Sequence, residues 1–367
     1  MSRVLITTWD GGGNVPPALN LGVRLSRRGH EVLVVGWEAM AGRVAAAGLA
    51  FRPCPSVPAW PHELSFEDDM DRLETMLHDA RAERDIVATG AAFRPDVVVV
   101  DAMMAAAFRA AARLDRPAAV LGHLLYQRYA AGIGRIAPGA DLDNVATVLA
   151  LTPPGFDFDG PLPPNTRYVG PILHPDAPPT LAELGLTRLA EPGDRWVLLS
   201  LSTTQMRQAR VLPTLLDALG SLPIRVLVTL ADVVAPDDLT LPANATARGL
   251  VPHAAVLPFM AAVVTHGGLS TITAALAYGV PQVVIPQGRD QHRNAERVAA
   301  CGTGRVIPPG ASATVVAEAV ADTASDPAAV AASRDFAHTI ADLGHGARAT
   351  KEVADLTVRT PAAAATS

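Results

Sequence analysis

The chain has little cysteine and no long apolar run. The first shortage excludes a cysteine-bound metal cluster, and the second excludes a membrane-spanning protein. The 367 residues include two cysteines, Cys54 and Cys301. Two cysteines are too few for a metal cluster, and they need not form a disulfide with each other. No uninterrupted apolar stretch reaches the roughly 18 residues that a membrane span requires. A secretion signal is not recognisable either, because the first apolar run, Val4 to Thr8, is too short. We therefore expect a cytoplasmic protein with no membrane partner.

Basic residues are too scattered to suit a nucleic-acid partner. Lys351 is the only lysine, the formal net charge is -6, and the arginines form no basic stripe. We therefore expect no nucleic acid as a ligand. At this length the chain exceeds the usual size of one hydrophobic core, so two domains of roughly 150 to 200 residues are expected.

Apolar runs and Gly-rich loops alternate with helical stretches in the first half of the chain. The first apolar run ends at the loop Trp9 to Gly13, and a helical stretch and a second apolar run follow. This order is typical of the opening of a doubly wound parallel sheet, and so predicts the α/β class. The expected elements are strands at 3–8, 32–35, 97–100 and 118–121 and helices at 18–28 and 67–84.

A proline-rich segment from about 172 to 195 separates this series from a second one. Asp326 and Pro327 have the form of a helix cap followed by a first-turn proline. We expect domains at 1–175 and 195–346, a linker at 176–194 and a disordered tail at 358–367. The other expected elements are strands at 196–200, 225–230, 263–265 and 282–285, a short helix at 181–184, a helix at 211–219, and helical residues from 327 to 356 broken near Gly344 and Gly346.

The most informative stretch runs from Val263 to Ala295. Its first strand ends at His266-Gly267-Gly268, and a helix opens at Ser270-Thr271. Backbone N–H groups at a helix start, two hydroxyls and an imidazole suit an anion, and the helix dipole favours one there. After the next strand, Asp290-Gln291 offers a carboxylate and an amide that suit paired sugar hydroxyls. The two loops together predict a site for one diphosphate-sugar.

This stretch resembles the donor-binding signature of the inverting glycosyltransferases with the GT-B fold, the family of antibiotic and macrolide glycosyltransferases and plant UDP-sugar transferases. The resemblance runs through T-H-G-G, A-L-A-Y-G-V-P and D-Q-x-x-N-A. It implies two Rossmann-like domains facing a cleft, with the acceptor bound by the first domain and the donor by the second. It also implies a last helix, about 347–357, that packs back on the first domain. The implied donor is a TDP- or UDP-sugar, used as a substrate, and neither a cofactor nor a metal is needed.

The resemblance also assigns donor contacts residue by residue. Gly is more usual in the family than Ser at position 270. The run Asp68 to Asp71 looks like a metal-binding D-x-D motif, but it lies in a charged stretch far from the phosphate loops and is interpreted as a solvated helix surface. The implied contacts are Ser202, Thr203, His266, Gly267, Gly268, Ser270 and Thr271 to the diphosphate, Leu250 and Val251 to the base, and Asp290 and Gln291 to the sugar.

The acceptor half departs from the family pattern at one catalytic position. Family members carry a histidine in the first loop that deprotonates the acceptor hydroxyl, and here Asn14 stands in its place, in Gly13-Asn14-Val15-Pro16. An amide cannot take a proton near neutral pH. Asp10 is our preferred replacement. Asp101, which matches the acid that normally orients the histidine, is the second, and an acceptor acidic enough to need little help is the third.

The predicted function is inverting transfer of a sugar, for instance a deoxysugar, to a nucleophilic group of a small hydrophobic natural product. A nucleotide-sugar epimerase is one alternative. A non-catalytic sugar-nucleotide-binding partner is another, suggested by Asn14, and a homodimer is left open. The residues assigned to the acceptor are Gly13, Trp60, Phe66, Met70 and His123.

Overall fold

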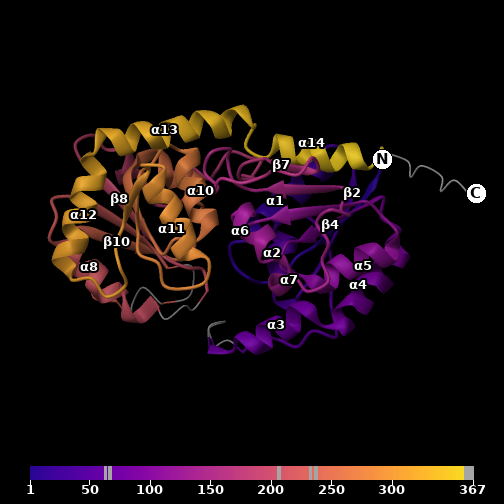
Figure 1. Cartoon of the computed structure of the whole chain (residues 1–367). Coiled ribbons are helices and arrows are strands. Elements are labelled where there is room, and N and C mark those ends of the chain that lie inside the picture. The colour runs from indigo at the N-terminus through magenta and orange to yellow at the C-terminus, as the bar shows by residue number, and fades with distance from the viewer. Residues whose placement is uncertain (62–63, 65–67, 205–207, 231–233, 235–238, 359–367) are drawn as a thin grey trace, which may run out of the picture.

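Two parallel β-sheets follow one another along the chain, each with its own helices (Figure 1). The structure, a computed structural model, describes residues 1–61, 64, 68–204, 208–230, 234 and 239–358. Phe66, much of the loop after Trp60 and the expected tail from 359 onward lie outside the described residues. The predicted α/β class with two parallel sheets is confirmed.

The first sheet has the strand order β3-β2-β1-β4-β5-β6-β7, and every neighbouring pair is parallel. Its central strands are runs of Val, Leu and Ile with buried residues on both faces, as helices on both sides require. The strands are β1 (Arg3–Thr7), β2 (Glu31–Gly36), β3 (Ala50–Pro53), β4 (Val97–Asp101), β5 (Ala118–Gly122), β6 (Thr147–Ala150) and β7 (Thr166–Tyr168).

The second sheet has the order β10-β9-β8-β11-β12-β13 and is also parallel throughout. In both sheets the strand order reverses beside the first strand of the series, β1 or β8, and such switch points are where ligands bind in open α/β sheets. The strands are β8 (Trp196–Ser200), β9 (Arg225–Thr229), β10 (Ala245–Arg248), β11 (Met260–Thr265), β12 (Gln282–Val284) and β13 (Gly304–Val306).

Helices of the first half connect its strands, and two of them differ from the sequence prediction. The helix α1 begins at Val15, earlier than expected, because the prolines after Val15 occupy its first turn. The charged run 67–84 is not one helix: Asp79 accepts a hydrogen bond from the Arg81 N–H and starts a second helix there. The helices are α1 (Val15–Arg27), α2 (Ala41–Ala46), α3 (Met70–His78), α4 (Ala80–Phe93), α5 (Ala105–Leu114), α6 (Tyr126–Ala131) and α7 (Ile133–Ile136), with a 3-10 turn at η1 (Glu38–Met40).

In the second half the predicted short helix at 181–184 is wrong. The segment makes a hydrogen-bonded turn, and Gly185 ends it with a φ of 63°. No helix among the described residues is long and apolar enough to span a membrane. The helices are α8 (Leu212–Gly220), α9 (His253–Val256), α10 (Leu269–Ala277), α11 (Gln291–Ala300), α12 (Ala313–Ser325), α13 (Pro327–Asp342) and α14 (Ala347–Leu356), with 3-10 turns at η3 (Thr187–Ala190), η4 (Gln208–Arg210) and η6 (Leu257–Phe259).

The last helix lies against the first half of the chain, while α13 before it lies along the second half (Figure 1). The chain turns between the two helices at Gly344 and Gly346, which have φ values of 72° and 107°. Side chains of α14 share a core with the first sheet because its buried face is apolar. This core includes Val4 and Ile6 of β1, Leu21 of α1, and Ala349, Val353 and Leu356 of α14.

The Asp326 cap of α13 gives the first testable prediction. Its Oδ1 accepts hydrogen bonds from the N–H groups of Ala328 at 2.9 Å and Ala329 at 3.3 Å, so the predicted cap is confirmed. Asp326→Ala leaves both groups without this acceptor and is expected to lower the free energy of unfolding by about 1 kcal/mol, as measured by urea unfolding. Asp335→Ala, at an exposed site inside the same helix, is the control, and equal losses in the two variants would contradict the capping role.

Candidate active site

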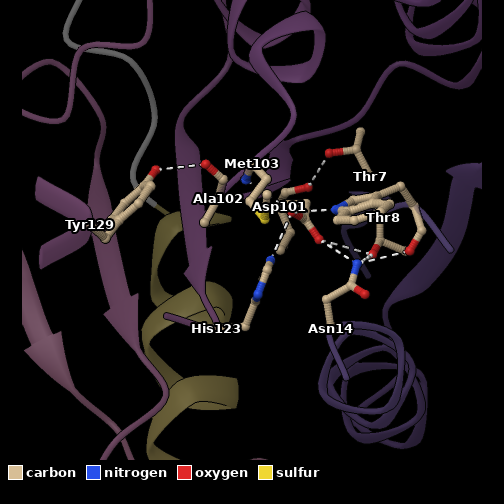
Figure 2. Close-up of polar contacts among 10 residues, drawn as sticks. Thr7, Thr8, Asn14, Asp101, Ala102, Met103, His123 and Tyr129 are labelled. Atoms are coloured by element: carbon tan, nitrogen blue, oxygen red, sulfur yellow. Dashed lines mark hydrogen bonds and ion pairs between the residues drawn. The ribbon is translucent and has the colours of Figure 1, made fainter. Parts of the chain in front are cut away.

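Asp101, the last residue of β4, is the centre of a buried polar network (Figure 2). Its side chain is fully buried, and both carboxylate oxygens are occupied. The Oδ2 atom accepts from Thr8 Oγ1 at 3.1 Å and Asn14 Nδ2 at 2.9 Å. The Oδ1 atom accepts from Trp9 Nε1 at 3.2 Å, the Met103 N–H at 3.0 Å and His123 Nε2 at 2.9 Å.

The sheet order explains why these residues meet. The strands β1, β4 and β5 are neighbours, and their carboxyl ends lie at one edge of the sheet. Thr8 follows β1, Asp101 ends β4 and His123 follows β5, while Asn14 precedes α1. The network therefore lies at the carboxyl ends of the strands, which is where ligands bind in open α/β sheets.

Charge and hydrogen bonding set the protonation of the pair that Asp101 forms with His123. Burial on its own would raise the pKa of the Asp101 carboxyl, but the charge of His123 and the hydrogen bonds from His123 and Asn14 outweigh it and lower that pKa. Burial likewise opposes the charged form of His123. The charge and hydrogen bond of Asp101, with a smaller effect of the Asp290 charge, prevail and raise the pKa of His123.

Asn14 uses its amide to hold this network. Its Nδ2 donates to Thr8 Oγ1 at 3.1 Å, to the Trp9 carbonyl at 2.8 Å and to Asp101. The side chain is 3% exposed and does not cap α1, although Asn14 is the residue before that helix. Asn14, which the sequence places at the position of the histidine in the resembled family, is thus hydrogen-bonded to the Asp101 carboxylate.

Asp10, preferred as the base from sequence, has a different partner. Its Oδ1 atom forms an ion pair with Arg43 of α2. The guanidinium occupies one of the two carboxylate oxygens that could accept a substrate proton. This contact could not be predicted from the sequence, because α2 lies beyond the next strand of the chain.

The donor loop after β11 is a tight turn that begins α10. Gly267 has a φ of 93°, and a Cβ atom on it would lie 2.8 Å from Val284 Cγ1. A Cβ atom on Gly268 would lie 2.7 Å from Nε2 of His266, so the imidazole folds over that glycine. Burial first, and then the charge of Arg289, lower the pKa of His266 to about 3, which keeps the ring neutral.

Side chains of α11 hold the loop after β12 by hydrogen bonds. Gln291 Oε1 accepts the N–H groups of Gln287 at 2.7 Å and Gly288 at 3.2 Å. Asn294 Nδ2 donates to the Gly267 carbonyl at 2.9 Å and to Asp290 Oδ2 at 2.8 Å, so one amide joins the two donor loops. The sequence signal for Asn294 was its place in the D-Q-x-x-N string, four residues and about one helical turn after Asp290.

The loops of the two halves touch beside this turn. A Cβ atom on Gly12 would lie 2.6 Å from Thr203 Oγ1, and one on Gly13 would lie 3.4 Å from the Ser270 Cβ. Ser202 Oγ bonds to Thr204 Oγ1 at 2.9 Å and so shapes the loop that carries Thr203. The Gly-rich loop after β1 therefore faces both the loop after β8 and the start of α10.

An apolar cluster holds the two halves together next to these loops. Leu125 and Phe156 of the first half pack with Leu269 and Ile272 of α10 and with residues of α11. Arg297 Nε of α11 also donates to the Phe156 carbonyl at 2.9 Å. The segment after β5, which carries His123, thus lies against the helix starts of the second half.

The described residues that the sequence assigns to the base and to the rest of the acceptor site are not part of the Asp101 network. Leu250 is 70% exposed, whereas Val251 is buried in a core that it shares with residues of β8, β9 and β11. Trp60 Nε1 donates to the Leu64 carbonyl at 2.9 Å, and Met70, the first residue of α3, is 42% exposed. Phe66 falls outside the described residues.

The D-x-D run is the start of a helix. Asp69 caps α3 by accepting from the Arg72 N–H at 3.0 Å, and Asp71 lies in the first turn. Across the described ranges, no group of three or more His, Cys, Asp or Glu side chains is arranged to hold a metal ion.

Comparison with known proteins gives the class first. The fold matches that of the calicheamicin glycosyltransferase CalG4, with a TM-score of 0.76 and 24% identity over 98% of this chain and 99% of that one. It also matches the glycosyltransferase SsfS6 of Streptomyces sp. SF2575, complexed with thymidine diphosphate, with a TM-score of 0.71 and 24% identity over 96% of this chain and all of that one. The architecture is therefore that of the GT-B glycosyltransferases.

Sequence comparison then gives the family. Residues 213–355 match the model of the erythromycin biosynthesis protein CIII-like C-terminal domain. The chain is 31% identical over 388 residues to the elloramycin glycosyltransferase ElmGT of Streptomyces olivaceus, covering 93% of this chain and 94% of that protein. The chain belongs to the antibiotic glycosyltransferase family, and its activity is the transfer of a sugar to a natural-product acceptor.

Proposed function

We propose that the chain transfers a sugar from a thymidine diphosphate donor, with inversion at the anomeric carbon, to a hydroxyl of a hydrophobic aglycone. The observation that carries this proposal is the contact of Gly12 and Gly13 with Thr203 and Ser270. It puts an acceptor-side loop directly against the loops that would hold the diphosphate. An attacking hydroxyl and a leaving diphosphate can then approach one carbon from opposite sides.

Thymidine rather than uridine is favoured by the structural relatives. SsfS6 was solved with thymidine diphosphate, as was VinC, which matches with a TM-score of 0.72 and 23% identity. A neutral His266 can donate an N–H to the diphosphate, and the N–H groups of Leu269 and Ser270, the first two residues of α10, come before the first hydrogen-bonded turn of the helix. These donors stabilise the negative charge that grows on the leaving group as the glycosidic bond breaks.

The remaining assignments also divide the two substrates between the two domains. The first domain, 1–175, takes the acceptor, the second, 195–346, takes the donor, and 176–194 links them. Asp290 and Gln291 are assigned to the sugar hydroxyls. Asn294 links Asp290 to the turn at Gly267 by donating hydrogen bonds to both residues. The diphosphate contacts are Ser202, Thr203, His266, Gly267, Gly268, Ser270 and Thr271, the base contacts are Leu250 and Val251, and the acceptor contacts are Gly13, Trp60, Met70 and His123.

Release of nucleoside diphosphate tests this function. TDP-glucose and UDP-glucose are incubated with the full chain, with and without a panel of aromatic polyketide aglycones, and the freed diphosphate is measured. Release that depends on the aglycone, and is faster with the thymidine donor, is expected. Isomerisation of the sugar without release would favour an epimerase, and tight binding without turnover would favour a non-catalytic partner.

A further inference from the structure

We propose that His123 is the general base that deprotonates the acceptor hydroxyl, with Asp101 as its positioning residue. The inference rests on the proposed function and supplies the group that Asn14 cannot. In the resembled family the base comes from the first loop of the sheet, whereas here it would come from the loop after β5.

Asp101 is excluded as the direct base by its surroundings. Its side chain is fully buried, and five hydrogen bonds fill its two oxygens. A carboxylate oxygen has two lone pairs in the plane, and those of Asp101 are occupied by protein donors. A substrate proton could reach Asp101 only through one of its partners.

His123 is the most exposed of the side chains that are hydrogen-bonded to Asp101. Its side chain is 11% exposed, and it contacts Asp101 through Nε2 at 2.9 Å. Because a carboxylate only accepts, Nε2 carries the proton, and the neutral ring then has its lone pair on Nδ1. Figure 2 shows Nδ1 on the part of the ring that points away from Asp101.

The donor side of the site lies within electrostatic reach of the same ring. The charge of Asp290, which is assigned to the sugar, acts on His123 across the two halves. Asp101 and Asp290 are the two charged groups whose fields act on the ring, one from β4 and one from the start of α11. Leu125, two residues after His123, packs against α10 and α11, so the segment that carries the imidazole lies on the side of the first half that meets the donor half.

The step balances as a single displacement. The lone pair of Nδ1 takes the acceptor O–H proton while that oxygen forms a bond to the anomeric carbon. The bond from that carbon to the diphosphate oxygen breaks, and its electron pair leaves with the nucleoside diphosphate. The imidazolium that results is stabilised by the Asp101 carboxylate, which keeps its negative charge.

The pH dependence has a fixed sign. A base must be unprotonated to act, so kcat falls as the pH drops through the pKa of His123. Since Asp101 and Asp290 raise that pKa, the acid limb of the profile is expected above the ordinary histidine value of about 6.5. Asp101→Asn removes the charge that has the larger effect on the pKa of His123, and should therefore move the acid limb of the profile to lower pH.

The decisive variant is His123→Gln, assayed with TDP-glucose and with 4-nitrophenol, phenol and benzyl alcohol as acceptors of falling acidity. A lost general base lowers kcat by about 10² to 10⁴-fold and abolishes the acid limb, while the Kd of thymidine diphosphate is unchanged. The defect should grow from 4-nitrophenol to benzyl alcohol, since a more acidic hydroxyl needs less help. His174→Gln, which alters a surface histidine beside Asp176, is the matched control and should keep the parental rate.

Two outcomes would overturn the assignment. One is a His123→Gln defect of equal size for every acceptor, which indicates a structural role. The other needs no turnover: nitrogen NMR of the full chain with thymidine diphosphate bound reports the ring tautomer, and a proton on Nδ1 instead of Nε2 leaves no base on the outward side. Failure of the unaltered chain to release diphosphate with any aglycone would instead count against the proposed function.

Discussion

Gly267→Ala is expected to lower the affinity for thymidine diphosphate by about tenfold or more, because two effects act together at that residue. Its φ of 93° is outside the range that a side chain tolerates, and the new Cβ would lie 2.8 Å from Val284 Cγ1. The β-branched Val284 is buried in β12 and has little freedom to move away. The turn would have to shift, and 1.4 kcal/mol of lost contact to the diphosphate already equals a tenfold change in Kd.

Gly193→Ala separates the two effects. Its φ of 98° is close to that of Gly267, but a Cβ atom there would meet nothing within 4 Å. We expect backbone strain in both variants and loss of nucleotide binding in Gly267→Ala alone, as measured by calorimetric titration. If both variants bind thymidine diphosphate like the parent, the turn at Gly267 does not hold the diphosphate.

Asp101→Ala is expected to have the largest effect on stability. The substitution removes the acceptor of five hydrogen bonds in a fully buried place and leaves the His123 ring without its counter-charge. Breaking a buried pair by removing one partner costs about 3–5 kcal/mol, because the other groups stay buried and unpaired. Urea unfolding measures the loss, and Asp335→Ala at an exposed site inside α13 is the control that should change little.

The size of this loss should depend on pH. The pKa of Asp101 is lowered in the fold, so its contribution is present above the unfolded value of about 3.9 and is lost as the pH falls through the folded value. The pKa of His123 is raised, so its contribution is present below about 6.5 and is lost as the pH rises through the folded value. The difference between parent and variant is therefore expected to be largest between about pH 4 and 6.5. A difference that is flat with pH would contradict the ion pair.

The sequence predicts the sheets well because their signals are local. Apolar runs followed by Gly-rich or polar loops mark β1, β4, β5, β8 and β11, and the donor string from Val263 to Ala295 lies on consecutive loops of one sheet. The helix cap at Asp326 is also local and is confirmed. These features depend on residues a few positions apart, so no knowledge of the tertiary structure is needed to recognise them.

The acceptor side is harder because its contacts join distant residues. Asp101 meets Asn14 and His123 only after three strands have paired, and the sequence gives no measure of which oxygen each donor will occupy. The ion pair of Asp10 shows the same limit, since its partner Arg43 comes from a helix beyond β2. A missing histidine in the first loop could be noticed from sequence, but its replacement could not be chosen.

The two crossings of the chain between its halves lie side by side. The outgoing segment passes Ile172 and Leu173, and the returning one passes His345 and Gly346, with the Leu173 N–H donating to the His345 carbonyl at 3.2 Å. Arg24 of α1 also donates to both carbonyls, at 3.0 Å to Leu173 and at 2.9 Å to His345. The two crossings are therefore tied to one another and to α1, so any rotation of one half against the other would have to bend the backbone where these two segments lie side by side.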